Sequence, residues 1–269
     1  MRPQYYYLVA GLPAMVLDSG RPAPSYKAVT ESILEQLDSA DAALLRKMRQ
    51  ETDHANLLAR LDGARGAFRD QGNFTDEETV LALKNPAALP SPFPDWFAAR
   101  AAGRPLFPGL LWEDQLAWLY YDEMIACGNG FLRQWYAFER DRKNLLAALN
   151  ARSAGRPVTE AVIGDSEMAG LIRKSRAADF GVTPVSHWAG RLLALNAEEP
   201  TAFELGVERI RWDMLDQLSA NAFFSADVIF AFCVRIASVN RWQALNPEAG
   251  RDLFQRAIRA LENPQPAAA

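Results

Sequence analysis

The sequence has few of the residues on which catalytic and metal sites most often depend. Among 269 residues there are two cysteines, Cys127 and Cys233, and two histidines, His54 and His187. Two lone thiols do not make the disulfide framework that holds small secreted proteins together. A reducing cytoplasm is therefore the expected compartment.

The sequence also lacks long apolar runs and an excess of positive charge. No stretch approaches the roughly 18 consecutive apolar residues that a membrane-spanning helix needs. The net charge is −4 and the isoelectric point is about 5.4, whereas proteins that bind nucleic acid normally carry a basic surface. We therefore expect neither a transmembrane segment nor a nucleic-acid partner.

The opening residues, MRPQYYYLVAGLP, do not have the pattern of a secretory signal. A single arginine is the only early charge, and the Gly-Leu-Pro step cuts the apolar run short. We expect instead a short helix that begins near Gln4 and ends at this step. Residues 1–13 should pack against the C-terminal third of the chain, with Tyr6, Leu8 and Val9 mostly buried.

Apolar spacing and turn residues predict helices along most of the chain. Segment 25–62 repeats apolar residues with a helical period, and Thr75 to Glu78 has the sequence of a capping box. No long alternating run of β-branched residues marks a central strand, although RPVTEAVIG after Gly155 could hold one short edge strand. The predicted fold class is all-α. Further helical patterns occupy residues 112–126, 130–151, 166–177, 186–196, 201–220, 225–245 and 248–262.

Three stretches of the sequence are similar to one another. NLLARLDGARG begins at Asn56, NLLAALNARSAG at Asn144 and NRWQALNPEAG at Asn240. Upstream of the second and third copies, a helical pattern carries an acid, a tryptophan and an acid at positions i, i+4 and i+8. These side chains share one helix face; they are Asp114, Trp118 and Asp122 in one helix, and Glu208, Trp212 and Asp216 in the other.

The similarity predicts a single domain of three pseudo-repeated helical units, at approximately residues 25–90, 105–160 and 200–262. Such units form a solenoid-like or funnel-like array because each is too small to bury its own apolar face. The proline-rich stretch 85–94 is the best internal boundary. Chance similarity between alanine- and leucine-rich helices is the alternative. The repeated asparagine is either bonded to the backbone of a neighbouring unit or simply a tolerated polar position.

The repeat signature resembles that of the V-type ATPase C-subunit family, which is also called the d-subunit family. An aromatic residue and a charged residue precede Asn-Leu, and a leucine-rich end and a glycine follow; residues 203–250 carry this pattern best, although Arg241 replaces the leucine there. The opening YYYLVAGLP resembles a bacterial branch of uncharacterised proteins associated with V-type ATPases.

The resemblance implies an all-helical funnel of three pseudo-equivalent lobes. Such a protein is non-catalytic, sits in the cytoplasm on the membrane rotor ring at the inner membrane, and holds the foot of the rotor shaft. The four acids of the repeated helices are then candidate partner-contact residues, because they could meet a basic shaft. The alternative is that they are solvated helix faces. The two tryptophans between them fit the core better than an interface.

Two other functions stay open: a helical-repeat scaffold of another complex, and an enzyme with an unrecognised site. Glu51 and His54 have the ligand spacing of a di-iron helix, but Pro184 stands where a second glutamate would precede His187. Ser166 lacks a downstream histidine base and fits a helix N-cap better than a nucleophile. There is no phosphate-binding glycine loop. We therefore expect no catalytic residue, no metal and no cofactor.

Overall fold

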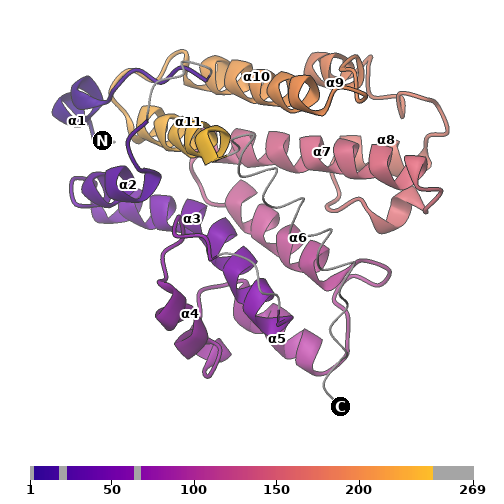
Figure 1. Ribbon diagram of the computed structural model, residues 1–269, viewed down its shortest axis with the longest axis horizontal. Coiled ribbons are helices and arrows are strands. Elements are labelled where there is room, and N and C mark those ends of the chain that lie inside the picture. Colours follow the sequence, from indigo (N-terminus) through magenta and orange to yellow (C-terminus); the bar gives the residue numbers. More distant parts are fainter. Residues whose placement is uncertain (1–2, 18–22, 64–67, 245–269) are drawn as a thin grey trace, which may run out of the picture.

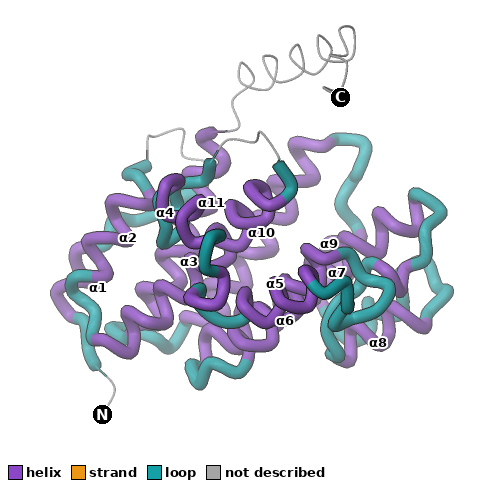
Figure 2. Tube along the Cα trace, turned by 90° about the horizontal axis from the view of Figure 1, so that it is seen from below, coloured by secondary structure: helices purple, strands orange, loops and turns teal. Residues whose placement is uncertain are grey.

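The computed structural model describes residues 3–17, 23–63 and 68–244, so the helix expected over 248–262 lies outside the described residues. Helices joined by loops make up this part of the chain, without a strand, and the prediction of an all-α fold is confirmed (Figures 1 and 2). None of these helices is long and apolar enough to cross a bilayer. The α-helices are α1 Tyr6–Gly11, α2 Tyr26–Leu34, α3 Ser39–Leu61, α4 Asp76–Ala82, α5 Phe93–Ala101, α6 Trp112–Ile125, α7 Gly130–Ser153, α8 Glu167–Lys174, α9 His187–Leu193, α10 Pro200–Ser219 and α11 Ala226–Ala244, and two short 3-10 helices span Pro86–Ala88 and Val158–Glu160.

Capping residues set the ends of many of these helices. The hydroxyl of Thr75 accepts from the N–H of Glu78, whose carboxylate accepts in turn from the N–H of Thr75, so the predicted capping box is confirmed. Ser166 caps α8, as expected for it. Glycine follows the two long helices α3 and α7, because Gly63 and Gly155 take positive φ values of 65° and 66°.

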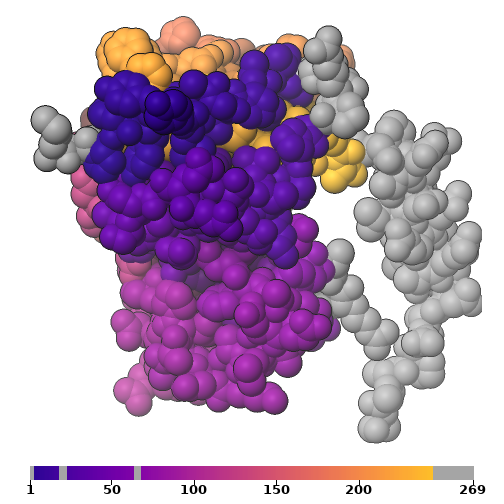
Figure 3. Space-filling view, turned by 90° about the vertical axis from the view of Figure 1, so that its left-hand side faces the viewer, coloured from indigo at the N-terminus to yellow at the C-terminus, as the bar shows by residue number. Residues whose placement is uncertain are grey.

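The long helices pack in a connected series. Helix α6 lies between α3 and α7, α10 joins α7 to α11, and α2 packs against α11 (Figure 1). The N-terminal residues lie between the C-terminal helices and α3 on one face of the molecule (Figure 3). The two ends of the described chain are therefore brought together in space.

Within the described ranges, buried side chains form two clusters. The larger lies among α2, α3, α6, α7, α8, α9, α10 and α11. The smaller one joins α3, α5 and α6 and includes Leu57, Leu89 and Trp96. Because Leu89 and Phe93 are buried in this second cluster, the proline-rich stretch 85–94 is built into the core rather than linking two bodies. The boundary expected at residues 85–94 therefore does not separate two bodies; the chain only changes direction there.

The opening helix forms where it was expected but lies on the outside of the molecule. The N–H of Tyr5 donates to the carbonyl of Phe224 at 2.7 Å, and the ring of Tyr6 packs 4.7 Å from that of Phe224. The segment thus contacts the C-terminal third. However, Tyr6 is 56% exposed and no residue of α1 is buried, so the expectation of mostly buried positions is wrong. A six-residue helix on the surface packs against the protein on one side only, so the residues on its other side stay exposed.

Candidate functional site

The first two repeated asparagines make the same contact. On α3, the Nδ2 of Asn56 donates to the carbonyl of Arg69 at 2.8 Å, and its Oδ1 accepts from the N–H of Arg69 at 3.1 Å. On α7, Asn144 bonds both backbone groups of Ile163 in the same way, at 2.7 and 2.9 Å. In both places one side-chain amide satisfies the N–H and the carbonyl of a single loop residue. We call this paired hydrogen bond an asparagine clasp.

The third asparagine makes its clasp with the other end of the chain. On α11, the Nδ2 of Asn240 donates to the carbonyl of Pro24 at 3.0 Å, and its Oδ1 accepts from the N–H of Tyr26 at 2.8 Å. In all three places the clasped segment leads into a helix that a Ser or Thr side chain caps: α4, α8 and α2. Asn240 thus bonds the backbone at the start of another expected unit, whereas Asn56 bonds Arg69 within its own unit, 25–90. The expected bond to a neighbouring unit is therefore not general to the three copies.

The clasp also explains why no edge strand forms after Gly155. The polar groups of Ile163 are already paired with a side chain on α7, and Val158–Glu160 upstream is a 3-10 helix. The pattern of residues suits an extended segment, but the partner is a helix. The expected strand is therefore wrong, although the backbone pairing that a strand needs is present.

An aspartate three positions before the asparagine supports the first two clasps. The Oδ1 of Asp53 accepts from the N–H groups of Asn73 and Phe74 at 2.6 and 3.2 Å, and Asp141 accepts from the hydroxyl of Ser166 at 2.7 Å. Both aspartates thus hold the chain just before the next helix. The sequence contains this signal, Asp-x-x-Asn, in two of the three copies.

Glu208 does not have the exposed position expected for a partner-contact acid. It is only 2% exposed, and its carboxylate accepts from Arg211 at 2.9 Å, from Arg241 and from the hydroxyl of Ser238 at 2.6 Å. Burial alone would raise the pKa of Glu208, but the arginines hold it below its ordinary value. The expectation is wrong for this residue because arginines on its own helix and on α11 satisfy its charge internally.

Arg211 extends this network from α10 to α7. Its Nε donates to the Oε1 of Glu139 at 3.0 Å, and Arg142 donates to both oxygens of the same carboxylate. These arginines lower the pKa of Glu139 despite its burial. The charges are paired and hydrogen-bonded, which is the condition for burying them, and they fix the register between α7 and α10.

Asp122 and Asp216, the second acids of the repeated pattern, are exposed. Their side chains are 55% and 73% exposed, and each lies beside an arginine of the next helix. Arg140 reaches Asp122 at 3.5 Å, and Arg235 pairs with Asp216. Both aspartates are accessible to a partner, but each already shares its charge with the protein.

The two repeated tryptophans are neither fully buried nor free. Trp118 lies parallel to Phe107, with ring centroids 3.9 Å apart, and its Nε1 donates to Asp122 at 2.9 Å. Trp212 lines a shallow cavity beneath α1, where the guanidinium of Arg235 lies 5.7 Å from its ring centroid. Each tryptophan therefore lies between its own helix and a neighbouring loop or N-terminal segment.

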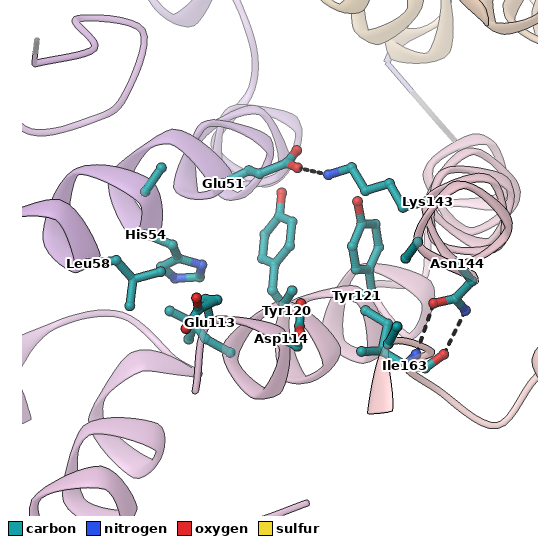
Figure 4. Close-up of a pocket in the computed structure, with 15 residues that line it drawn as sticks. Glu51, His54, Leu58, Glu113, Asp114, Tyr120, Tyr121, Lys143, Asn144 and Ile163 are labelled. Carbon is teal, nitrogen blue, oxygen red and sulfur yellow. Dashed lines mark hydrogen bonds and ion pairs between the residues drawn. The ribbon is translucent and has the colours of Figure 1, made fainter. Parts of the chain in front are cut away.

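Asp114 lines a cavity of about 200 Å³ between α3, α6 and α7 (Figure 4). An ion pair between Glu51 and Lys143 crosses one end of the cavity, and Glu113 and Asp114 lie on α6 at the other. The side chain of Glu51 is half-exposed, and the ammonium of Lys143 holds its pKa below the ordinary value against a desolvation effect that would raise it. The phenol ring of Tyr121 lines the wall between the two ends.

His54 forms part of the same cavity as a neutral side chain. Its ring stands edge-on to that of Tyr120, at 5.4 Å between centroids, and lies 6.2 Å from the ring of Phe93. Burial lowers the pKa of His54 to about 4. The carboxylate of Glu51 is committed to Lys143, and no group of three His, Cys, Asp or Glu side chains in the described ranges is arranged to hold a metal.

Comparison with family models identifies the chain. Residues 2–264 match the model of a family described as "Protein of unknown function (DUF2764)". The chain belongs to the DUF2764 family. Comparison with curated proteins and with solved structures gives no match.

In this DUF2764 protein, all three clasp helices border a second, larger cavity. Its volume is about 600 Å³, and residues of α3, α7 and α11 line it together with residues of α2 and α10. Trp135 and Tyr136 of α7 and Asn240 of α11 are among them. The helices that bear the repeated asparagines thus surround a common space.

Proposed function

We propose that this DUF2764 protein is a non-catalytic central-stalk component of a V-type ATPase or ATP synthase. In this role it couples the rotor shaft to the membrane rotor ring, and it lies in the cytoplasm, held at the inner membrane through the complex. The observation that supports this most directly is the asparagine clasp. Each of the three asparagines of the sequence signature that resembles the V-type ATPase C-subunit family bonds one carbonyl and one N–H of a backbone segment, which belong to one residue for Asn56 and Asn144 and to Pro24 and Tyr26 for Asn240.

The packing suits a part that transmits torque. Such a part has to resist shear between its helices, and paired buried groups with fixed geometry provide that resistance better than apolar contacts alone. The clasps tie each loop to a long helix, and the Glu139–Arg211–Glu208 network ties α7 to α10. The cavity of about 600 Å³ bordered by the three clasp helices offers a socket for the end of a shaft.

Affinity purification tests this proposal. The chain is expressed with a tag in its native host, membranes are solubilised in a mild detergent, and the proteins recovered are identified by mass spectrometry. We expect the shaft proteins and the membrane ring to be recovered, and an unrelated tagged protein of similar size serves as the control. Recovery of a different, reproducible set of proteins without any shaft or ring protein would instead support a scaffold of another complex and overturn the coupling role.

A further inference from the structure

The cavity between α3, α6 and α7 has uncompensated negative charge at one end. Glu113 and Asp114 line it, and neither forms a hydrogen bond or an ion pair through its side chain with any residue in the described part of the chain. Asp122, two turns further along α6, differs because it lies beside Arg140. Desolvation and the charge of Glu113 both raise the pKa of Asp114. A cation placed here would therefore be stabilised.

The wall of the same cavity contains a second unsatisfied group. Tyr121 is 2% exposed, yet its hydroxyl has no hydrogen-bond partner among the residues that the structure describes. The adjacent Tyr120 differs, since its hydroxyl bonds the carbonyls of Lys47 and Met48. Buried hydroxyl groups normally find a partner. Because Tyr121 lines the cavity (Figure 4), its hydroxyl oxygen is free to accept a hydrogen bond from a donor on a bound group.

Apart from Asn144 and the Glu51–Lys143 ion pair at the other end, the remaining surface of the cavity is largely aromatic and aliphatic. Leu116 and Tyr120 are each 1% exposed, and the neutral ring of His54 faces the same space. A volume of about 200 Å³ is below the range of roughly 300–1,000 Å³ typical of sites for whole small molecules. The size fits a single large side chain.

We propose that this cavity receives the side chain of an arginine from a partner protein, with its guanidinium beside Glu113 and Asp114. A guanidinium is planar, more weakly hydrated than an ammonium, and able to stack on aromatic rings while donating to carboxylates. Arginine is also among the residues that most often anchor protein interfaces in such pockets. The inference rests on the proposed function for the identity of the partner, which would be a basic segment of the shaft.

A titration with a small probe tests the pocket itself. N-acetyl-arginine amide is added to the full chain while the ring signals of His54 are followed by NMR. We expect saturable shifts with a dissociation constant in about the low-millimolar range, and no saturation with N-acetyl-norleucine amide. In the Glu113→Gln/Asp114→Asn variant the affinity should fall at least about tenfold, whereas Asp122→Asn serves as the matched control and should bind normally. Equal binding by the double variant, or by norleucine, overturns the proposal.

Tyr121→Phe separates a ligand contact from a structural role. Because the hydroxyl is unpaired in the free protein, its removal should leave the melting temperature unchanged or raise it. The affinity for the arginine probe should fall several-fold at the same time. A lowered melting temperature with unchanged probe affinity would contradict the assignment of this hydroxyl to a bound group.

Co-purification of the double variant distinguishes this inference from the proposed function. If the wild type recovers shaft proteins and the Glu113→Gln/Asp114→Asn variant does not, both are supported. If both chains recover them equally, the arginine pocket is refuted and the coupling role stands. If the wild type binds the arginine probe but never recovers shaft or ring proteins, the coupling role fails and the pocket remains.

Discussion

Replacing Asn144 with alanine should destabilise the protein more than replacing either of the other clasp asparagines. Asn144 is 2% exposed and Ile163 is 6% exposed, so water cannot easily replace the lost amide. The substitution leaves the N–H and the carbonyl of Ile163 unpaired in the interior. The clasp of Asn240 lies nearer the surface, because its bond to Pro24 is exposed, and solvent can satisfy the same groups there.

The magnitude follows from the two backbone groups. Each buried polar group left without a partner costs about 1–3 kcal/mol, so Asn144→Ala should lower the free energy of unfolding by about 2–6 kcal/mol. For Asn240→Ala we expect about 1 kcal/mol, the net value of hydrogen bonds that water can replace. Asn56, whose two bonds are partly buried, should fall between them. This range is a large fraction of the total stability of an ordinary domain.

Urea unfolding followed by far-UV circular dichroism measures these differences. Asn150→Ala is the matched control, because Asn150 is exposed on the same helix and its replacement should change the stability by less than about 0.5 kcal/mol. Asn144→Asp should be at least as destabilising as Asn144→Ala at neutral pH, since a carboxylate cannot donate to the carbonyl of Ile163. Asn144→Ala within about 0.5 kcal/mol of the wild type, or equal losses at all three clasps, would refute the argument.

Three further predictions concern single side chains. His54 takes up a proton near its ordinary pKa of 6.5 in the unfolded state but only near 4 in the folded state. The free energy of unfolding should therefore be about 3 kcal/mol higher above pH 6.5 than at pH values below 4, and the loss should occur between these two values. NMR ring signals of His54 that titrate above pH 6 would contradict this. Gly72→Ala should lower the free energy of unfolding by about 1–3 kcal/mol, because the Cβ of the new alanine would overlap the Oδ1 of Asp53. An unchanged melting temperature would show that the loop adjusts freely. Glu208→Gln should lower the free energy of unfolding in urea by about 3–5 kcal/mol, whereas Asp216→Asn should lower it by about 1 kcal/mol or less. Equal losses in the two variants would contradict the role given to the buried Glu208 network.

Most of the helices could be predicted because local signals determine them. The helix expected over 130–151 is observed at Gly130–Ser153, and that expected over 201–220 at Pro200–Ser219. Apolar period, cap residues and terminal glycines lie within each segment, so no knowledge of the fold is needed. The end of α8 at Lys174 is three residues earlier than the pattern indicated. Element ends are the part that local patterns determine least well.

The environments of the acids could not be predicted in the same way. Asp114 and Glu208 occupy the same position of the repeated pattern, yet one lines an open cavity and the other is buried against arginines. The difference comes from Arg241 and Ser238 on α11, which lie 33 and 30 positions from Glu208. The environment of each acid is determined by residues that the fold brings next to it, and these cannot be identified from the pattern within one helix.

The loop that pairs with Asn144 shows another limit of local patterns. Residues 157–163 suit an extended segment in sequence, and the backbone of Ile163 is paired, but with an amide on a helix rather than with another strand. The aspartate that supports this clasp, Asp141, is visible in the sequence. Its purpose becomes clear only when the segment it holds, beginning at Ser166, is placed next to it.

The clasp between α11 and the N-terminal segment also sets an order of events during synthesis. Asn240 is 216 positions from Pro24, so at about 5–20 residues per second its amide is made roughly 10–40 s later. During that interval the face of α2 that becomes buried, which includes Tyr26, Thr30 and Ile33, lacks α11, a helix against which it packs. The helix whose amide holds the N-terminal segment is therefore the last of the described helices to be made.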